Sequence, residues 1–222
     1  MIKSIFYKEW IKTRLCLIST FVVLTVVAVY CIVTIGRVID LHGAAKVWQM
    51  MILKDAVFVT LLTYFPLVAG IFMAAAQFFP EMSRKSLKLM LHLPVSGEKA
   101  TLSMLGFGSV SLLLSFLPGA VFLCVGLSMK IAPVLVWRVM LTAAVWYLAG
   151  VAAYFLTSFV ILEPVWKFRI PEAIMSVLLL RVYFLSSSAC AYEKFIISLT
   201  IVTISMILLP WISVIRFREG KQ

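Results

Sequence analysis

The stretch EMSRKSLKLMLHLPVSGEKA, residues 81–100, is the longest polar interruption in a chain that is otherwise mostly apolar. Of the 222 residues, 64% are hydrophobic and 13% are charged, and the mean hydropathy is +1.11. Soluble domains usually carry about 25% charged residues, so this composition is typical of a membrane protein. The segments between the apolar runs are each too short to bury a core, and we therefore expect a single membrane domain over residues 1–222.

Six apolar runs are long enough to cross a bilayer, which takes roughly 20 residues of helix. They cover residues 15–36, 56–79, 102–127, 134–162, 171–190 and 195–215. The sequence therefore predicts an all-α integral membrane fold with six transmembrane helices. The polar loop at 80–100 joins the second helix to the third, and an even number of crossings places both termini on one side.

The distribution of lysine and arginine predicts which side the termini occupy. Thirteen basic residues fall on the side of the termini: Lys3, Lys8, Lys12, Arg14, Arg84, Lys85, Lys88, Lys99, Lys167, Arg169, Arg216, Arg218 and Lys221. Six fall on the other side: Arg37, Lys46, Lys54, Lys130, Arg138 and Lys194. Cytoplasmic loops are enriched in these residues, so we expect both termini in the cytoplasm. The net charge of +11 then reflects topology and attraction to anionic lipid, not nucleic-acid binding.

The N-terminal segment MIKSIFYKEWIKTR, residues 1–14, has an amphipathic pattern. On a helical wheel four apolar side chains share one arc and two lysines point away: Ile2, Ile5, Phe6 and Trp10, against Lys8 and Lys12. This pattern predicts a helix lying in the cytoplasmic interface. A plain charged tail next to the membrane is the alternative.

The loop at 80–100 also has two faces. A basic arc holds Arg84, Lys85, Lys88 and His92, and an apolar arc holds Leu87, Met90 and Leu91. Pro94 ends the pattern, which predicts a short amphipathic helix at the cytoplasmic rim. Anchoring to anionic headgroups explains such a helix, but it does not explain the acidic Glu81 directly after Pro80.

Residues 78–105, FFPEMSRKSLKLMLHLPVSGEKATLSML, resemble the cytoplasmic loop of ABC-2 type transporter permeases. In that family an acidic residue opens a short helix that ends in Leu-Pro. The YKEW of residues 7–10 and the six-span layout are similar to the same family across nearly the whole chain. The family often has glycine where this chain has Lys85, and it usually places re-entrant helices before the last span, where only AYEK, residues 191–194, separates spans five and six here.

The resemblance implies a role for each matched position. Glu81 matches the acidic residue, Ser86 and Leu87 the small-plus-leucine pair, and Leu93 and Pro94 the Leu-Pro. In the family this loop is the coupling helix that docks on a separate ATPase subunit. The residues expected to serve that contact are Glu81, Arg84, Lys85, Ser86, Leu87, Lys88, Met90, Leu91, His92, Leu93 and Pro94.

The resemblance also implies partners and a location. The chain has no GxxxxGK[ST] motif, so it has no phosphate-binding loop of its own. ATP and Mg²⁺ would be bound by the partner ATPase, and this chain would hold no cofactor. Two permease chains, identical or paired with a sister chain, would assemble with two ATPase subunits in a bacterial inner membrane. Neither composition nor spacing selects a substrate.

Arg181 lies about ten residues into the fifth apolar run, where a charge costs at least about 2.5–3.5 kcal/mol. One interpretation places it on a water-filled translocation pathway or against a partner chain. The other, which we favour, ends the fifth helix early and makes residues 183–194, YFLSSSACAYEK, a short hairpin that does not cross the membrane. Non-crossing backbone is tolerated where protein or water covers it.

Other classes of site have weaker support in the sequence. Cys16, Cys31, Cys124 and Cys190 lack a metal-binding or redox spacing and are expected to pack within helices. An integral membrane enzyme would need a motif such as HExxH or GxSxG, and both are absent. A non-transporting anchor or scaffold for a cytosolic partner is the main alternative to a permease. Gly70 and Ala74 form a small-residue stripe that suits packing inside the bundle or, less well, a dimer seam.

Overall fold

The computed structural model describes residues 2–53, 55–83, 97–186 and 188–218, and all regular structure in these ranges is helical. The α-helices are α1 (Ile2–His42), α2 (Ala44–Leu53), α3 (Phe65–Ser83), α5 (Gly97–Ser128), α6 (Pro133–Leu162), α7 (Trp166–Arg181), α8 (Ile196–Ser205) and α9 (Leu208–Arg218). Three short 3₁₀ helices are η1 (Thr60–Thr63), η2 (Val182–Phe184) and η3 (Glu193–Phe195).

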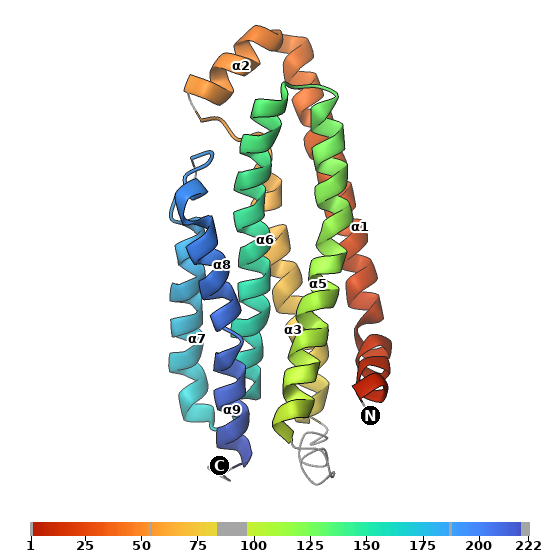
Figure 1. The fold of residues 1–222 in the computed structure, drawn as a ribbon, viewed down its shortest axis with the longest axis vertical. Coiled ribbons are helices and arrows are strands. Elements are labelled where there is room, and N and C mark those ends of the chain that lie inside the picture. Colours follow the sequence, from red (N-terminus) through yellow and green to blue (C-terminus); the bar gives the residue numbers. More distant parts are fainter. Residues whose placement is uncertain (1, 54, 84–96, 187, 219–222) are drawn as a thin grey trace.

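The helices form an elongated bundle with two distinct ends (Figure 1). At one end α1 and α5 begin, α3 and α9 end, and α6 connects to α7. We call this the loop end, because α3 and α5 flank residues 84–96 there. The opposite end, called the far end, carries α2 and the connection between α7 and α8. The first and last described helices thus meet the same end of the bundle.

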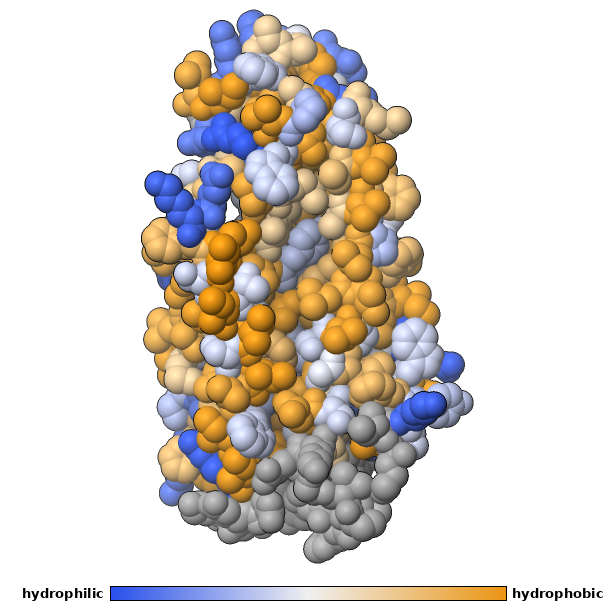
Figure 2. All heavy atoms as spheres, in the orientation of Figure 1, coloured by the Kyte–Doolittle hydropathy of each residue, from blue (hydrophilic) through white to orange (hydrophobic). Residues whose placement is uncertain are grey.

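Five helical segments of the described chain are long and apolar enough to cross a membrane. They are Lys3–His42, Thr60–Ser83, Ala100–Ser128, Pro133–Leu162 and Glu193–Arg216. In Figure 2 apolar side chains cover the middle of the visible face, and hydrophilic ones gather toward the two ends. The chain is therefore an all-α protein, and its long apolar helices are typical of a multi-pass membrane protein.

The run 171–190, predicted as the fifth span, is not among these five. Its helix, α7, has 16 residues and a length of about 24 Å at 1.5 Å per residue, short of a hydrocarbon core of about 30 Å. Tyr192 then closes a turn: its hydroxyl donates to the Val182 carbonyl at 2.8 Å and accepts from the Leu185 amide at 3.0 Å. The chain reverses at this turn and continues into α8.

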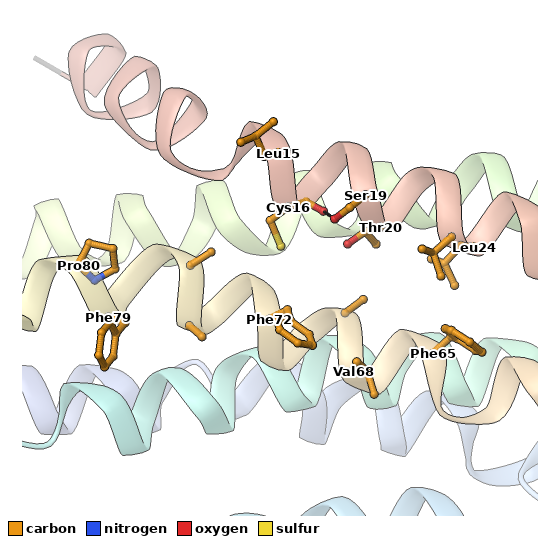
Figure 3. A pocket seen from close by; sticks show the side chains of 14 residues that line it. Leu15, Cys16, Ser19, Thr20, Leu24, Phe65, Val68, Phe72, Phe79 and Pro80 are labelled. Carbon is orange, nitrogen blue, oxygen red and sulfur yellow. Dashed lines mark hydrogen bonds between the residues drawn. The ribbon is translucent and has the colours of Figure 1, made fainter.

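Helix α1 runs without interruption from Ile2 to His42. The segment predicted as a separate interfacial helix is therefore continuous with the first span. The ribbon of α1 bends near its N-terminal end (Figure 1), close to Leu15 (Figure 3). Just before the bend the Thr13 hydroxyl donates to the Glu9 carbonyl at 2.8 Å, and back-bonding of this kind often bends helices.

Helix α6 is the centre of the bundle. In its most apolar stretch 72% of residues are buried, against at most 44% in the other candidate spans. Its closest neighbour is α3, and glycines set the approach. A Cβ at Gly70 would overlap the carbonyl oxygen of Gly150, and a Cβ at Gly150 would lie 2.6 Å from the carbonyl oxygen of Pro66. The small residue at position 70 thus serves packing within one chain.

This crossing gives a stability prediction. Gly70→Ala should destabilise the protein by about 1–3 kcal/mol, because the two backbones must separate to admit the methyl group. Gly106→Ala is the matched control, since nothing lies within 4 Å of a Cβ there. Thermal unfolding in detergent, followed by tryptophan fluorescence, should show a lower midpoint for Gly70→Ala alone. Equal midpoints for the two variants would contradict the close crossing.

Candidate functional site

The strongest polar site of the described chain lies at the loop end, around Glu81 near the C-terminus of α3. The side chain is buried, with 2% of the residue exposed. Its Oε1 lies 2.7 Å from Lys8 Nζ and 2.8 Å from Lys12 Nζ. A carboxylate in the last turn of a helix meets the negative end of the helix dipole, so the two lysines of α1 offset both that repulsion and the loss of water.

Lys12 joins this site to two further groups. Its Nζ donates to the Gln77 carbonyl of α3 at 2.9 Å, a contact that suits a cation near the end of a helix. The same Nζ lies 3.1 Å from Oε1 of Glu9, which is fully buried. Within the described part of the chain, two carboxyl groups and two lysines therefore share one site between α1 and α3, and their formal charges balance.

A chain of hydrogen bonds runs from this site into the bundle. The Gln77 side chain donates to the Met104 carbonyl of α5 at 2.8 Å, and the Tyr154 hydroxyl of α6 donates to Gln77 Oε1 at 2.7 Å. Gly108 leaves the space for this pair, because a Cβ there would overlap the Tyr154 hydroxyl. The polar groups of one cluster thus connect α1, α3, α5 and α6.

A second charged cluster at the loop end joins α6, α7 and α9. Arg216 Nη1 lies 3.4 Å from Glu163 Oε2 and 3.2 Å from Glu172 Oε1. Burial raises the pKa of Glu172 to about 7, and the negative charge of Glu163 adds to the rise while Arg216 opposes it. Arg216 thus contacts two carboxyl groups from different parts of the chain and joins the end of α6 to α7 and α9.

The far end has its own ion pair. Arg138 of α6 contacts Asp55 Oδ1 at 2.8 Å and the Met51 carbonyl at 3.2 Å. The Thr142 hydroxyl accepts from the Cys190 amide at 3.2 Å, so the turn after α7 is also held against α6. Arg181 ends α7 with an exposed side chain, on the part of the helix nearer the far end, and is not in contact with the Glu81 cluster.

Of the residues predicted for the coupling loop, Glu81 is the one that the structure describes. Arg84, Lys85, Ser86, Leu87, Lys88, Met90, Leu91, His92, Leu93 and Pro94 lie outside the described residues. The structure adds Lys8, Lys12, Gln77 and Tyr154, which sequence reasoning did not assign to a site. Gln77 was detectable in principle, since it is a lone amide in an apolar run, but its partners are distant in sequence.

Two apolar grooves flank α3. One lies between α1 and α3, with a volume of about 830 Å³. Figure 3 shows side chains of both helices along it, from Leu15 and Pro80 at the loop end to Leu24 and Phe65 deeper in the bundle. The other, with a volume of about 760 Å³, lies between α3 and α7 over part of α6.

Comparison of the chain with protein-family models, with curated proteins and with solved structures gives no match. We therefore infer function from the charged clusters, from the topology and from the pattern of residues 78–105. Among these the Glu81 cluster is the most informative, because it joins the start of the polar loop to the helices that surround the bundle centre.

The Glu81 cluster predicts energetic coupling between two helices. Glu81→Gln should destabilise the protein by at most about 3 kcal/mol, less than a fully buried pair because Lys8 is half exposed. In a double-mutant cycle with Lys12→Met, the free energy lost through Lys12→Met should be much smaller in the Glu81→Gln background than in the wild type. Asp40→Asn, an exposed acid on the same helix, is the control. Additive effects on the thermal midpoint would refute the contact.

The Glu172 cluster predicts a pH dependence. A carboxyl group whose pKa rises from 4.5 to about 7 on folding binds more protons folded than unfolded between these values. Its contribution to the stability of the fold is complete below the unfolded pKa of 4.5 and is lost as the pH rises through the folded pKa of about 7. The thermal midpoint should therefore fall between about pH 5 and about pH 8, and Glu172→Gln should flatten that fall. The exposed acid variant Glu193→Gln should keep the wild-type slope; if Glu172→Gln does too, the assignment is wrong.

Proposed function

We propose that this chain is the membrane-spanning permease subunit of an ATP-driven exporter of the ABC-2 type. In this proposal residues 80–100 form the coupling loop contacted by a separate ATPase subunit. The observation that best supports it is the buried pairing of Glu81 with Lys8 and Lys12. A loop fixed at its base to two helices can transmit force, whereas a loop that only anchors to lipid has no need of such a connection.

The proposed mechanism treats the loop end as a lever. ATP-driven closure of the ATPase pushes the loop, and the push reaches the end of α3 at Glu81. The ion pairs pass it to α1, and Gln77 passes it to α5 and α6 through its bonds to the Met104 carbonyl and the Tyr154 hydroxyl. A packed bundle responds by switching between discrete arrangements, and ATP shifts their populations only through contacts that differ between them.

The charge distribution supports the proposed orientation. In the proposal the loop end faces the cytoplasm, because thirteen of the basic residues belong to segments on that side. A bacterial inner membrane, a second permease chain and the ATPase complete the assembly. In the proposal helix α7 enters the membrane from the cytoplasmic side. The turn closed by Tyr192 then lies inside the membrane, where contact with α6 covers it. Arg181 then faces water or the second chain near that turn.

Purification of the tagged chain from its native membrane in mild detergent tests the ATPase contact. We expect an ATPase to co-purify, and Leu87→Ser with Leu91→Ser to remove most of it. Leu41→Ser, at an exposed leucine of the far end, is the matched control and should retain the ATPase. Failure to recover ATPase activity with the wild-type chain would overturn the proposal.

A second measurement separates a transporter from a scaffold without knowledge of the substrate. ATP and vanadate added to the purified complex should change amide hydrogen exchange in α1 and α3 near the loop end, because the bundle changes its arrangement. A scaffold would bind the ATPase and show unchanged exchange in these helices. That outcome would favour the anchor function over the permease.

A further inference from the structure

The groove between α3 and α7 combines apolar walls with one basic side chain. Its walls and floor include Phe79 and Met82 of α3, Val160 and Ile161 of α6, and Ile170 and Ile174 of α7. Phe79, Ile170 and Ile174 are each more than half exposed, so the groove opens on the lateral surface of the bundle. That surface contacts lipid in a membrane protein, and a volume of about 760 Å³ lies in the range of small-ligand sites.

Arg169 lies at the edge of this groove in the first turn of α7. Its Nε donates to the Glu163 carbonyl at 2.9 Å, and its guanidinium stacks over the Trp166 ring at 5.3 Å. Among the described residues its two terminal amino groups have no hydrogen-bond partner. The side chain is thus held in place with two donors free, which is the geometry that binds a phosphate through two parallel hydrogen bonds.

We propose that this groove binds one anionic phospholipid, with an acyl chain between α3 and α7 and the headgroup phosphate on Arg169. Trp166 lies beside the headgroup, at the interfacial depth that tryptophan prefers. This site does not depend on the transport function, since it needs only that the loop end meets a lipid leaflet.

Charge and position favour an anionic lipid over the other occupants. The larger groove between α1 and α3 is lined by apolar and small polar residues without a charged one, so it has no means of selecting a headgroup. A second copy of this chain would bring further basic residues to Arg169, because the loop end is strongly basic. An anionic headgroup instead neutralises it, and each basic residue near such a surface contributes about 1 kcal/mol.

Native mass spectrometry of the full chain in detergent tests the site. The probes are nanodiscs of phosphatidylcholine with a minor fraction of phosphatidylglycerol, from which the chain is extracted with its bound lipid. We expect one retained phosphatidylglycerol for the wild type and about fivefold less for Arg169→Gln, the factor that about 1 kcal/mol implies. Lys167→Gln is the matched control. It removes one positive charge two residues away from Arg169, and the Lys167 side chain does not line the groove.

A groove-filling variant keeps the test valid if Arg169→Gln folds poorly. Ala173→Phe leaves the arginine in place and occupies the space of the acyl chain, so it should also lose the retained lipid. Equal retention of phosphatidylcholine and phosphatidylglycerol would overturn the proposal. So would equal losses in Arg169→Gln and Lys167→Gln, or a dimer that Ala173→Phe dissociates without any change in bound lipid.

Discussion

The pairing of the Glu81 carboxylate with Lys8 and Lys12 is the interaction on which the rest of the structure depends. A buried carboxylate without a partner costs several kcal/mol in a medium of low dielectric constant. Lys8 and Lys12 in the first turns of α1 offset that cost for Glu81 near the end of α3. This pairing holds residues 3–14 to the bundle and fixes the base of the polar loop in one place.

The need to pair buried or partly buried charges also explains which helices meet at the two ends of the molecule. Arg216 joins α9 to Glu163 and Glu172 at the loop end, and Arg138 joins α6 to Asp55 at the far end. Between the ends the helices approach through small residues instead, as at Gly70 and Gly150. Charges therefore determine which helix ends meet, and glycines determine how closely the middles pack. In the proposed lever mechanism, such a bundle would move as connected pieces.

Much of the fold could be predicted from the sequence because hydrophobic runs and helix length are local properties. The expected spans 102–127 and 134–162 agree closely with α5 and α6. For the run 171–190 two interpretations stood open, and the one with an early helix end agrees with α7, which ends at Arg181. Apolar composition alone could not decide between them, because it continues past Arg181, whereas the turn after the helix is held by Tyr192, which follows the run. Composition averages over a window and does not register one hydroxyl that bonds three backbone groups.

The candidate site could be predicted only in part, for a similar reason. Glu81 was found from its place before the polar loop, but its partners lie about 70 residues away in α1 and its link to Tyr154 is about as distant. No spacing rule connects residues so far apart in sequence. Helices α3 and α6 must first pack, and only then do the side chains of Gln77 and Tyr154, each in an apolar run, come within hydrogen-bond distance.

The orientation of the ion-paired loop end can be measured directly. Ser83 and Ser128 are exposed and lie at the loop end and the far end. Each can be changed to cysteine in a chain whose Cys16, Cys31, Cys124 and Cys190 are replaced by alanine. A membrane-impermeant thiol reagent should label Ser83→Cys in inside-out vesicles only, and Ser128→Cys in right-side-out vesicles only. Labelling of Ser83→Cys from outside intact cells would place the loop end away from any cytosolic ATPase and would contradict the account.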